Sequence, residues 1–174
     1  MSKTIPPAVL CLTLLGTTTL VHTAYADIPL DAAVDAAQAA IGACRANGYS
    51  ATVTILDADY STRIVLRDGN AAAPTVDIAR RKAYTVLKTG MSSGDFGKTV
   101  PGTSPPALPA PGDPPPPPPG PVNGDPNLIT WAGGLPINVG GKIIGAMSAS
   151  GAPGGDKDEA CVKVGLARLA VRLK

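Results

Sequence analysis

Histidine and aromatic residues are nearly missing from this sequence, and its charges almost cancel. The 174 residues include one histidine, His22, and only 3% aromatic residues. The core must therefore be built from alanine, valine, isoleucine and leucine. Fifteen lysines and arginines oppose thirteen acidic residues, for a net charge of +2. That balance gives no electrostatic reason to expect a nucleic acid or an anionic membrane surface as a partner.

The first 26 residues are expected to be a signal peptide. Lys3 supplies a positive start, residues 8–21 form an apolar run, and Ala24-Tyr25-Ala26 fits the small-x-small cleavage rule. The apolar run is shorter than the roughly 20 residues that span a bilayer. We expect an exported protein, periplasmic or secreted, whose mature chain begins at Asp27; the alternative is a retained amphipathic anchor.

Cleavage of the signal peptide would remove His22, the single histidine, and with it every catalytic or metal site that needs an imidazole. Without imidazole there is no Ser-His-Asp triad and no Cys-His pair, and histidine ligation of zinc is excluded. Two cysteines remain, Cys44 and Cys161, too few for a thiolate zinc site. An even number of cysteines in an oxidising compartment favours a disulfide. Two buried thiols acting as small apolar residues are the alternative.

The first half of the mature chain predicts a helix, a hairpin and a second helix. Residues 51–57 and 62–67 are rich in β-branched side chains and predict paired strands joined by a turn. The second helix is expected after Pro74, ending at Gly90. Apolar residues recur at helical spacing, in the first helix at Leu30, Val34, Ala37, Ile41 and Cys44, and in the second at Val76, Ala79, Ala83, Val86 and Leu87.

Proline dominates the middle of the chain. Half of residues 101–126 are proline, including six in succession from Pro114 to Pro119. Such a segment lacks amide donors and favours solvated polyproline II, so it cannot be core. One interpretation is a ligand for a proline-recognising partner. The favoured one is a stiff surface loop inserted into a single domain that spans residues 27–174.

The last third predicts three strands and a helix. The strands are expected at 128–131, 136–139 and 142–148, with a tight Gly140-Gly141 turn between the last two. Asp156, followed by Glu159 three residues later, predicts a capped helix start. The whole order suits an α+β domain in which an antiparallel sheet of about five strands is flanked by helices.

The glycine loop 151–155 stands before the last helix, an arrangement that can bind anions through free amides. Three carboxylates follow at once, at Asp156, Asp158 and Glu159. They are expected to satisfy the amides themselves and to repel phosphate. A metal site made by these acids is a minor hypothesis, because their spacing fits no calcium loop.

Arg80, Arg81 and Lys82 form a basic run on the second helix. Three consecutive residues cover about 200° of a helix, so they cannot share one direction. Lys82 flanks the apolar stripe, and its ammonium is expected to reach a cleft edge by snorkelling. There it could meet a carboxylate ligand. The alternative is that the three basic residues simply form the solvated side of the helix.

Several segments, in order, resemble the GlcG/HbpS-like family. They are IPLDAAVDAAQAAI, TVTILD, RDGNAAAPTVDIARRKAYT, GGLPI and GAMSASGAPGGDKDEAC. The resemblance covers nearly the whole mature chain except the proline insertion. It implies an antiparallel sheet flanked by helices in a profilin-like layering, often in a homo-oligomer. It also implies association with haem, although the mature chain lacks the histidine that would ligate it most strongly.

Two main hypotheses follow. The first is an exported binding protein for haem or another carboxylated small molecule, in which Arg80 and Lys82 meet acid groups. Tyr84 and Trp131 would offer flat apolar surface, and Gly133-Gly134 would permit close backbone approach. The second is a structural subunit that forms a homo-oligomer without ligand chemistry. An enzyme acting on a small hydroxy acid or carbonyl compound is a distant third.

Overall fold

The computed structural model describes residue 1, residues 27–101 and residues 119–173. The predicted signal peptide and most of the proline insertion lie outside these residues. Within them the element order is α1 (Leu30–Ala46), β1 (Thr52–Asp57), β2 (Thr62–Arg67), α2 (Thr75–Thr89), α3 (Ser93–Thr99), β3 (Gly134–Val139), β4 (Lys142–Ser150) and α4 (Gly155–Ala170).

The four strands form one antiparallel sheet in the order β2-β1-β4-β3. β1 precedes the proline insertion and β4 follows it, so the two parts of the chain share a sheet. Gly140 and Gly141 both have positive φ, 56° and 78°, and close the β3–β4 hairpin as the Gly-Gly pair predicts.

The expected fifth strand at 128–131 is wrong. Leu128 and Ile129 are buried as a strand would be, but side chains of α2 satisfy their backbone. Arg81 donates to the Leu128 carbonyl, and the Thr85 hydroxyl accepts from the Ile129 amide at 3.0 Å. The Leu128 carbonyl and the Ile129 amide therefore have hydrogen-bond partners without joining a strand ladder.

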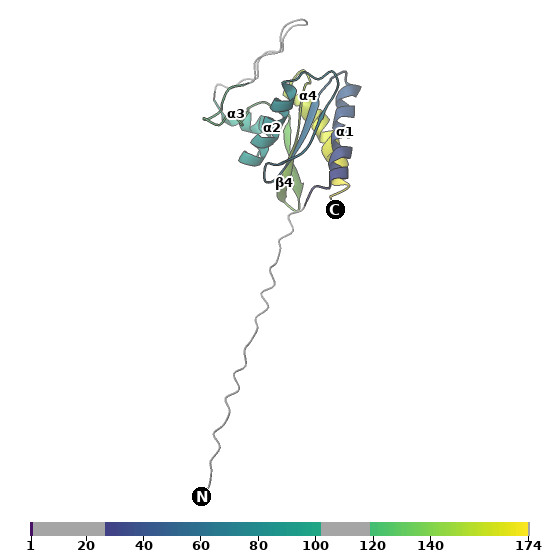
Figure 1. Ribbon diagram of the computed structural model, residues 1–174. Coiled ribbons are helices and arrows are strands. Elements are labelled where there is room, and N and C mark those ends of the chain that lie inside the picture. Colours follow the sequence, from purple (N-terminus) through teal and green to yellow (C-terminus); the bar gives the residue numbers. More distant parts are fainter. Residues whose placement is uncertain (2–26, 102–118, 174) are drawn as a thin grey trace.

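The helices cover both faces of the sheet (Figure 1). α1 and α4 pack together on one face, and α2 lies on the other with α3 beside it. The α1–α4 side holds the main core, which includes Val53, Ile55 and Met147. This is a three-layer α+β fold. Among the described helices, none combines the length and apolar character needed to cross a bilayer.

The buried face of α1 contains Ala37, Ile41 and Cys44 of the predicted stripe but not Leu30 or Val34. It is made mostly of alanine, whereas Leu30 is 60% exposed. The neighbouring α4 explains the preference for small residues, because a Cβ on Gly165 would lie 2.7 Å from the Ala36 carbonyl oxygen. In α2 the stripe is right for Ala79, Ala83 and Val86 but wrong for Val76, which is 37% exposed.

The short helix α3 was not predicted. Its N-cap is Ser92, whose hydroxyl accepts from the Asp95 amide at 3.0 Å. Phe96 is its one large apolar side chain, and it packs with Val122 and Leu128. Val122 belongs to the segment 101–126, so the prediction that this segment contributes nothing to the core is wrong at its C-terminal end. A seven-residue helix with a single anchor has too little periodicity to be recognised from sequence.

Candidate ligand-binding site

Lys82 forms a buried ion pair. Its ammonium lies 2.7 Å from Asp158 Oδ2 and donates to the Ala149 carbonyl at 2.9 Å. Lys82 is 2% exposed and Asp158 is 3% exposed. The prediction that Lys82 snorkels to a cleft edge is therefore wrong, because the carboxylate it meets is supplied by α4 rather than by a ligand.

Asp158 turns inward instead of capping α4. Its Oδ1 accepts from the Ala152 amide at 2.9 Å, and Gly154 is the N-cap without any side-chain cap bond. The capping box predicted for Asp156 and Glu159 is thus not formed. Burial raises the pKa of the Asp158 carboxyl, and the neighbouring Lys82 opposes that rise. Among the described residues, no three potential ligands gather around a metal site.

Gly133 and Gly134 make room for Lys82. A Cβ at Gly133 would stand 2.6 Å from Lys82 Nζ, and one at Gly134 would stand 2.6 Å from the Lys82 carbonyl oxygen. Gly133 also has a φ angle of 127°, which residues other than glycine rarely adopt. The close backbone approach predicted here is therefore made by α2, and the space is already filled.

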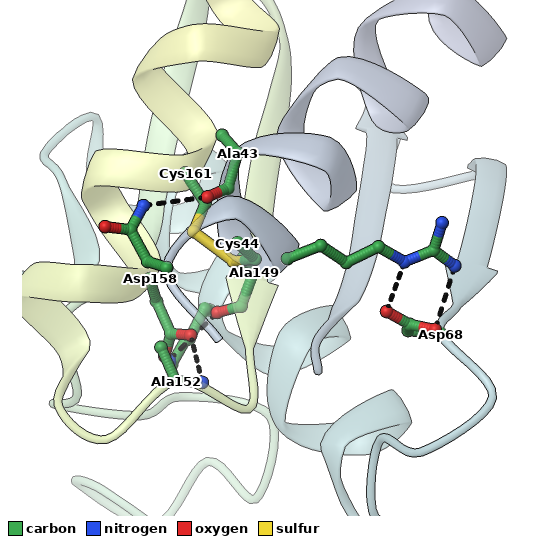
Figure 2. Close-up of a disulfide and its surroundings, with 10 residues drawn as sticks. Ala43, Cys44, Asp68, Ala149, Ala152, Asp158 and Cys161 are labelled. Atoms are coloured by element: carbon green, nitrogen blue, oxygen red, sulfur yellow. Dashed lines mark hydrogen bonds and ion pairs between the residues drawn. A yellow bond between two sulfur atoms is a disulfide. The ribbon is translucent and has the colours of Figure 1, made fainter. Parts of the chain in front are cut away.

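The disulfide lies near the Lys82–Asp158 ion pair. Cys44 at the end of α1 is joined to Cys161 in α4, across a sequence separation of 117 residues. Figure 2 shows this bond between the two helices, with Asp158 one turn from Cys161. Both cysteines are buried, at 0% and 3% exposure. The pairing is one of the two alternatives that the sequence left open.

Arg80 and Tyr84 lie on a different side of α2, near the surface. The Tyr84 ring contacts that of Tyr60, with centroids 5.1 Å apart, and its hydroxyl donates to Asp125 at 3.1 Å. Arg80 lies one helical turn before Tyr84, with its side chain 38% exposed and 3.0 Å from Asp77. We call Tyr60, Tyr84 and Arg80 the tyrosine platform.

The pKa shifts of Tyr84 and Asp125 determine which of the two groups holds a proton at neutral pH. Burial, reinforced by the hydrogen bond to Asp125, raises the pKa of the Tyr84 phenol. The Asn127 amide donates to Asp125 and lowers the pKa of that carboxyl. At neutral pH Tyr84 is therefore a protonated donor to an ionised carboxylate. Tyr60 and Asp125 were missed from the sequence, since both lie in turns that bear no catalytic or binding motif.

The structure thus divides the six predicted site residues. Lys82, Gly133 and Gly134 meet in the interior, while Arg80 and Tyr84 share the platform. Trp131 is half-buried on the segment leading into β3. The backbone of that segment packs on α3, since a Cβ on Gly97 would lie 2.2 Å from the neighbouring Thr130 carbonyl oxygen.

Comparison with known proteins identifies the family. The model of the family described as "Haem degrading protein HbpS-like" matches residues 28–167. The chain belongs to the HbpS-like family. Among curated proteins, none matches it.

Several solved structures share the fold. A double mutant of Streptomyces reticuli HbpS is 27% identical, with 92% of this chain and 97% of that chain covered and a TM-score of 0.68. The protein ORFY of Klebsiella pneumoniae is 21% identical, with 91% and 98% covered and a TM-score of 0.68. A PduOC:heme complex is 16% identical, with 80% and 93% covered and a TM-score of 0.63. The last two likenesses show the fold alone.

Proposed function

We propose that this HbpS-like protein binds a planar small molecule that carries carboxylates, with haem as the first candidate, on the tyrosine platform. The observation that carries the proposal is the contact of the Tyr60 and Tyr84 rings one helical turn from Arg80. Aromatic faces accept a flat apolar ring, and a guanidinium pairs with a carboxylate. The family description and the haem complex of a similarly folded protein support haem.

The described residues do not fit a strongly ligated haem iron. That part of the chain contains no histidine, and its two cysteines are bonded to each other. The Tyr84 hydroxyl is held by Asp125 and its pKa is raised, which disfavours the phenolate that iron prefers. Of the two methionines that could contact a haem, Met147 is buried in the core. Met91 is 37% exposed but follows the end of α2, about two helical turns along the chain from Tyr84. Binding would therefore rest on ring contact and carboxylate pairing rather than on an axial ligand.

Titration with two porphyrins tests this mode of binding. Haem and metal-free protoporphyrin should bind with similar affinity, because the iron contributes no bond to a side chain. Arg80→Gln should weaken both by up to about fivefold, the range of a solvent-exposed ion pair. Arg168→Gln, which removes the same charge from exposed α4, is the matched control. No saturable absorbance change with either porphyrin, or equal loss in both variants, would overturn the proposal.

We also infer that the chain is exported and that it forms a homo-oligomer. Export is supported by the leader-like residues 1–26 and by the disulfide, which persists in oxidising compartments. Self-association is favoured by three exposed apolar residues on the α1–α4 layer, Leu30, Val164 and Val171. Light scattering should give a mass above 17.4 kDa that falls in Val164→Asp. Cell fractionation would test the location.

A further inference from the structure

Arg81 is a buried cation that contacts main-chain carbonyls rather than a close carboxylate. Its guanidinium donates to three carbonyl oxygens from two places in the chain, those of Pro119 at 2.7 Å, Gly120 at 3.2 Å and Leu128 at 2.8 Å. The residue is 4% exposed, and its one ion-pair partner among the described residues, Asp77, lies 4.0 Å away. A buried charge needs hydrogen-bond partners. Arg81 therefore binds the two ends of the segment 119–128 together on α2.

The segment between these carbonyls presents Asp125 to Tyr84. Val122 and Asp125 exchange two amide-to-carbonyl hydrogen bonds, at 3.1 and 2.9 Å, which close a turn. Asp125 Oδ1 accepts from the Asn127 amide at 2.8 Å, and Oδ2 accepts from the Tyr84 hydroxyl at 3.1 Å. Tyr84 and Arg81 are three residues apart on α2, so they are neighbours on the helix surface. The same part of α2 thus contacts both the ends of the segment and the carboxylate it carries.

We propose that Arg81 is a positioning residue for the tyrosine platform, because it fastens residues 119–128 to α2 and so keeps Asp125 hydrogen-bonded to the Tyr84 hydroxyl. The role rests on the proposed binding at the platform, but the link itself needs no ligand. Hydrogen bonds from a charged donor are roughly twice as strong as neutral ones, and a buried carbonyl without a donor is unfavourable. Without Arg81 the segment would have to move until water reached its carbonyls.

Apolar packing is the alternative way to hold the turn. Val122 and Leu128 pack with Phe96 of α3, and Tyr84 lies against the same cluster. If that cluster were sufficient, removal of Arg81 would leave the Asp125 carboxylate in place, and the loss of a nearby cation alone would raise the pKa of the Tyr84 phenol. Release of Asp125 would lower that pKa, because the hydrogen bond to Asp125 raises it. The direction of the change therefore separates the two cases.

An NMR titration of the intact chain with labelled tyrosine rings, without any ligand, measures this direction. The Tyr84 resonance is identified by its absence in Tyr84→Phe. Arg81→Met removes the guanidinium but keeps a long side chain, and it should lower the Tyr84 pKa. Arg80→Met is the matched control, since it removes the same charge from the next position, where the guanidinium pairs with Asp77. It should raise the Tyr84 pKa, because Arg80 lowers it in the unaltered chain.

The Asp125 carboxyl gives the same answer at acid pH, should alkali unfold a variant. The Tyr84 hydroxyl lowers the pKa of Asp125, so Tyr84→Phe should raise that pKa in the otherwise unaltered chain. In the Arg81→Met background Tyr84→Phe should leave it unchanged, because the hydrogen bond is already lost. Arg81→Lys keeps a cation without the planar fork and should give an intermediate result in both titrations.

Porphyrin titration separates this proposal from the proposed function. Arg81→Met and Asp125→Ala should weaken the binding of haem by the same factor, and the double variant should weaken it no further. Absence of porphyrin binding in the unaltered chain would end the proposed function, whereas the Tyr84 titration would still decide the role of Arg81. A Tyr84 pKa that is unchanged or raised in Arg81→Met, with the fold retained by circular dichroism, would overturn the proposal.

Discussion

Removal of Lys82 should strongly destabilise the protein, because its partner would stay buried without a cation. Asp158 is 3% exposed and would keep only the Ala152 amide as a donor. Breaking one side of a buried ion pair typically costs about 3–5 kcal/mol. A domain of this size unfolds with about 5–15 kcal/mol, so Lys82→Met should lose about a fifth or more of the total stability.

Urea unfolding at pH 7, followed by the fluorescence of the single tryptophan Trp131, measures this loss. The exposed pair Lys98–Asp95 has the same 2.7 Å separation, and Lys98→Met should scarcely change the unfolding free energy. The double variant Lys82→Met/Asp158→Leu should recover most of the loss, since it leaves no buried charge. A loss below about 1 kcal/mol in Lys82→Met would refute the reasoning, because that is the scale of an exposed pair.

The pH dependence of the unfolding free energy provides a second test of Lys82→Met. Burial already raises the pKa of Asp158, and loss of Lys82 removes the charge that opposes the rise. A carboxyl whose folded pKa is raised favours the folded state below its unfolded pKa, and that contribution is lost as pH rises through the folded pKa. The deficit of Lys82→Met should therefore shrink as pH falls toward the ordinary aspartate value of 3.8. A deficit independent of pH would contradict the assignment.

Three further outcomes are expected. Replacing both disulfide cysteines by alanine should lower the unfolding free energy by up to about 4–5 kcal/mol in urea, since the bond closes a loop of 117 residues; an unchanged midpoint would contradict this. The Arg45 guanidinium lowers the pKa of Asp68, so the stability advantage over Asp68→Asn should be full above pH 3.8 and disappear as pH falls through the lowered pKa. Gly133→Ala should cost at least about 1–3 kcal/mol because of its φ and the nearby Lys82 ammonium, whereas Gly69→Ala, with open space around it, should be nearly neutral in thermal melts.

Local patterns predicted the elements well. The hairpin 51–57 and 62–67, the Gly-Gly turn and the end of the second helix at Gly90 follow from residue types whose conformational preferences act over a few neighbours. The prediction of a fifth strand at 128–131 is wrong because contacts with a distant helix determine the structure of that segment. A buried apolar run can pair with a strand or with side chains, and here the positions of Arg81 and Thr85 on α2 decide between them.

The candidate site was harder to predict than the fold. Lys82 flanks an apolar stripe, and sequence alone cannot tell whether its carboxylate partner is a ligand or a residue 76 positions away. Tyr60 meets Tyr84 through a turn whose backbone carries a positive φ at a non-glycine residue, a feature that sequence does not announce. Local sequence patterns therefore do not determine which distant segments contact one another.

The bond between Cys44 and Cys161 closes most of the polypeptide into a covalent ring that includes all four strands and the proline insertion. A protease that nicked the chain anywhere between 102 and 118 would consequently release nothing, since the two fragments would separate only after reduction. Gel mobility with and without a reductant would report such a nick.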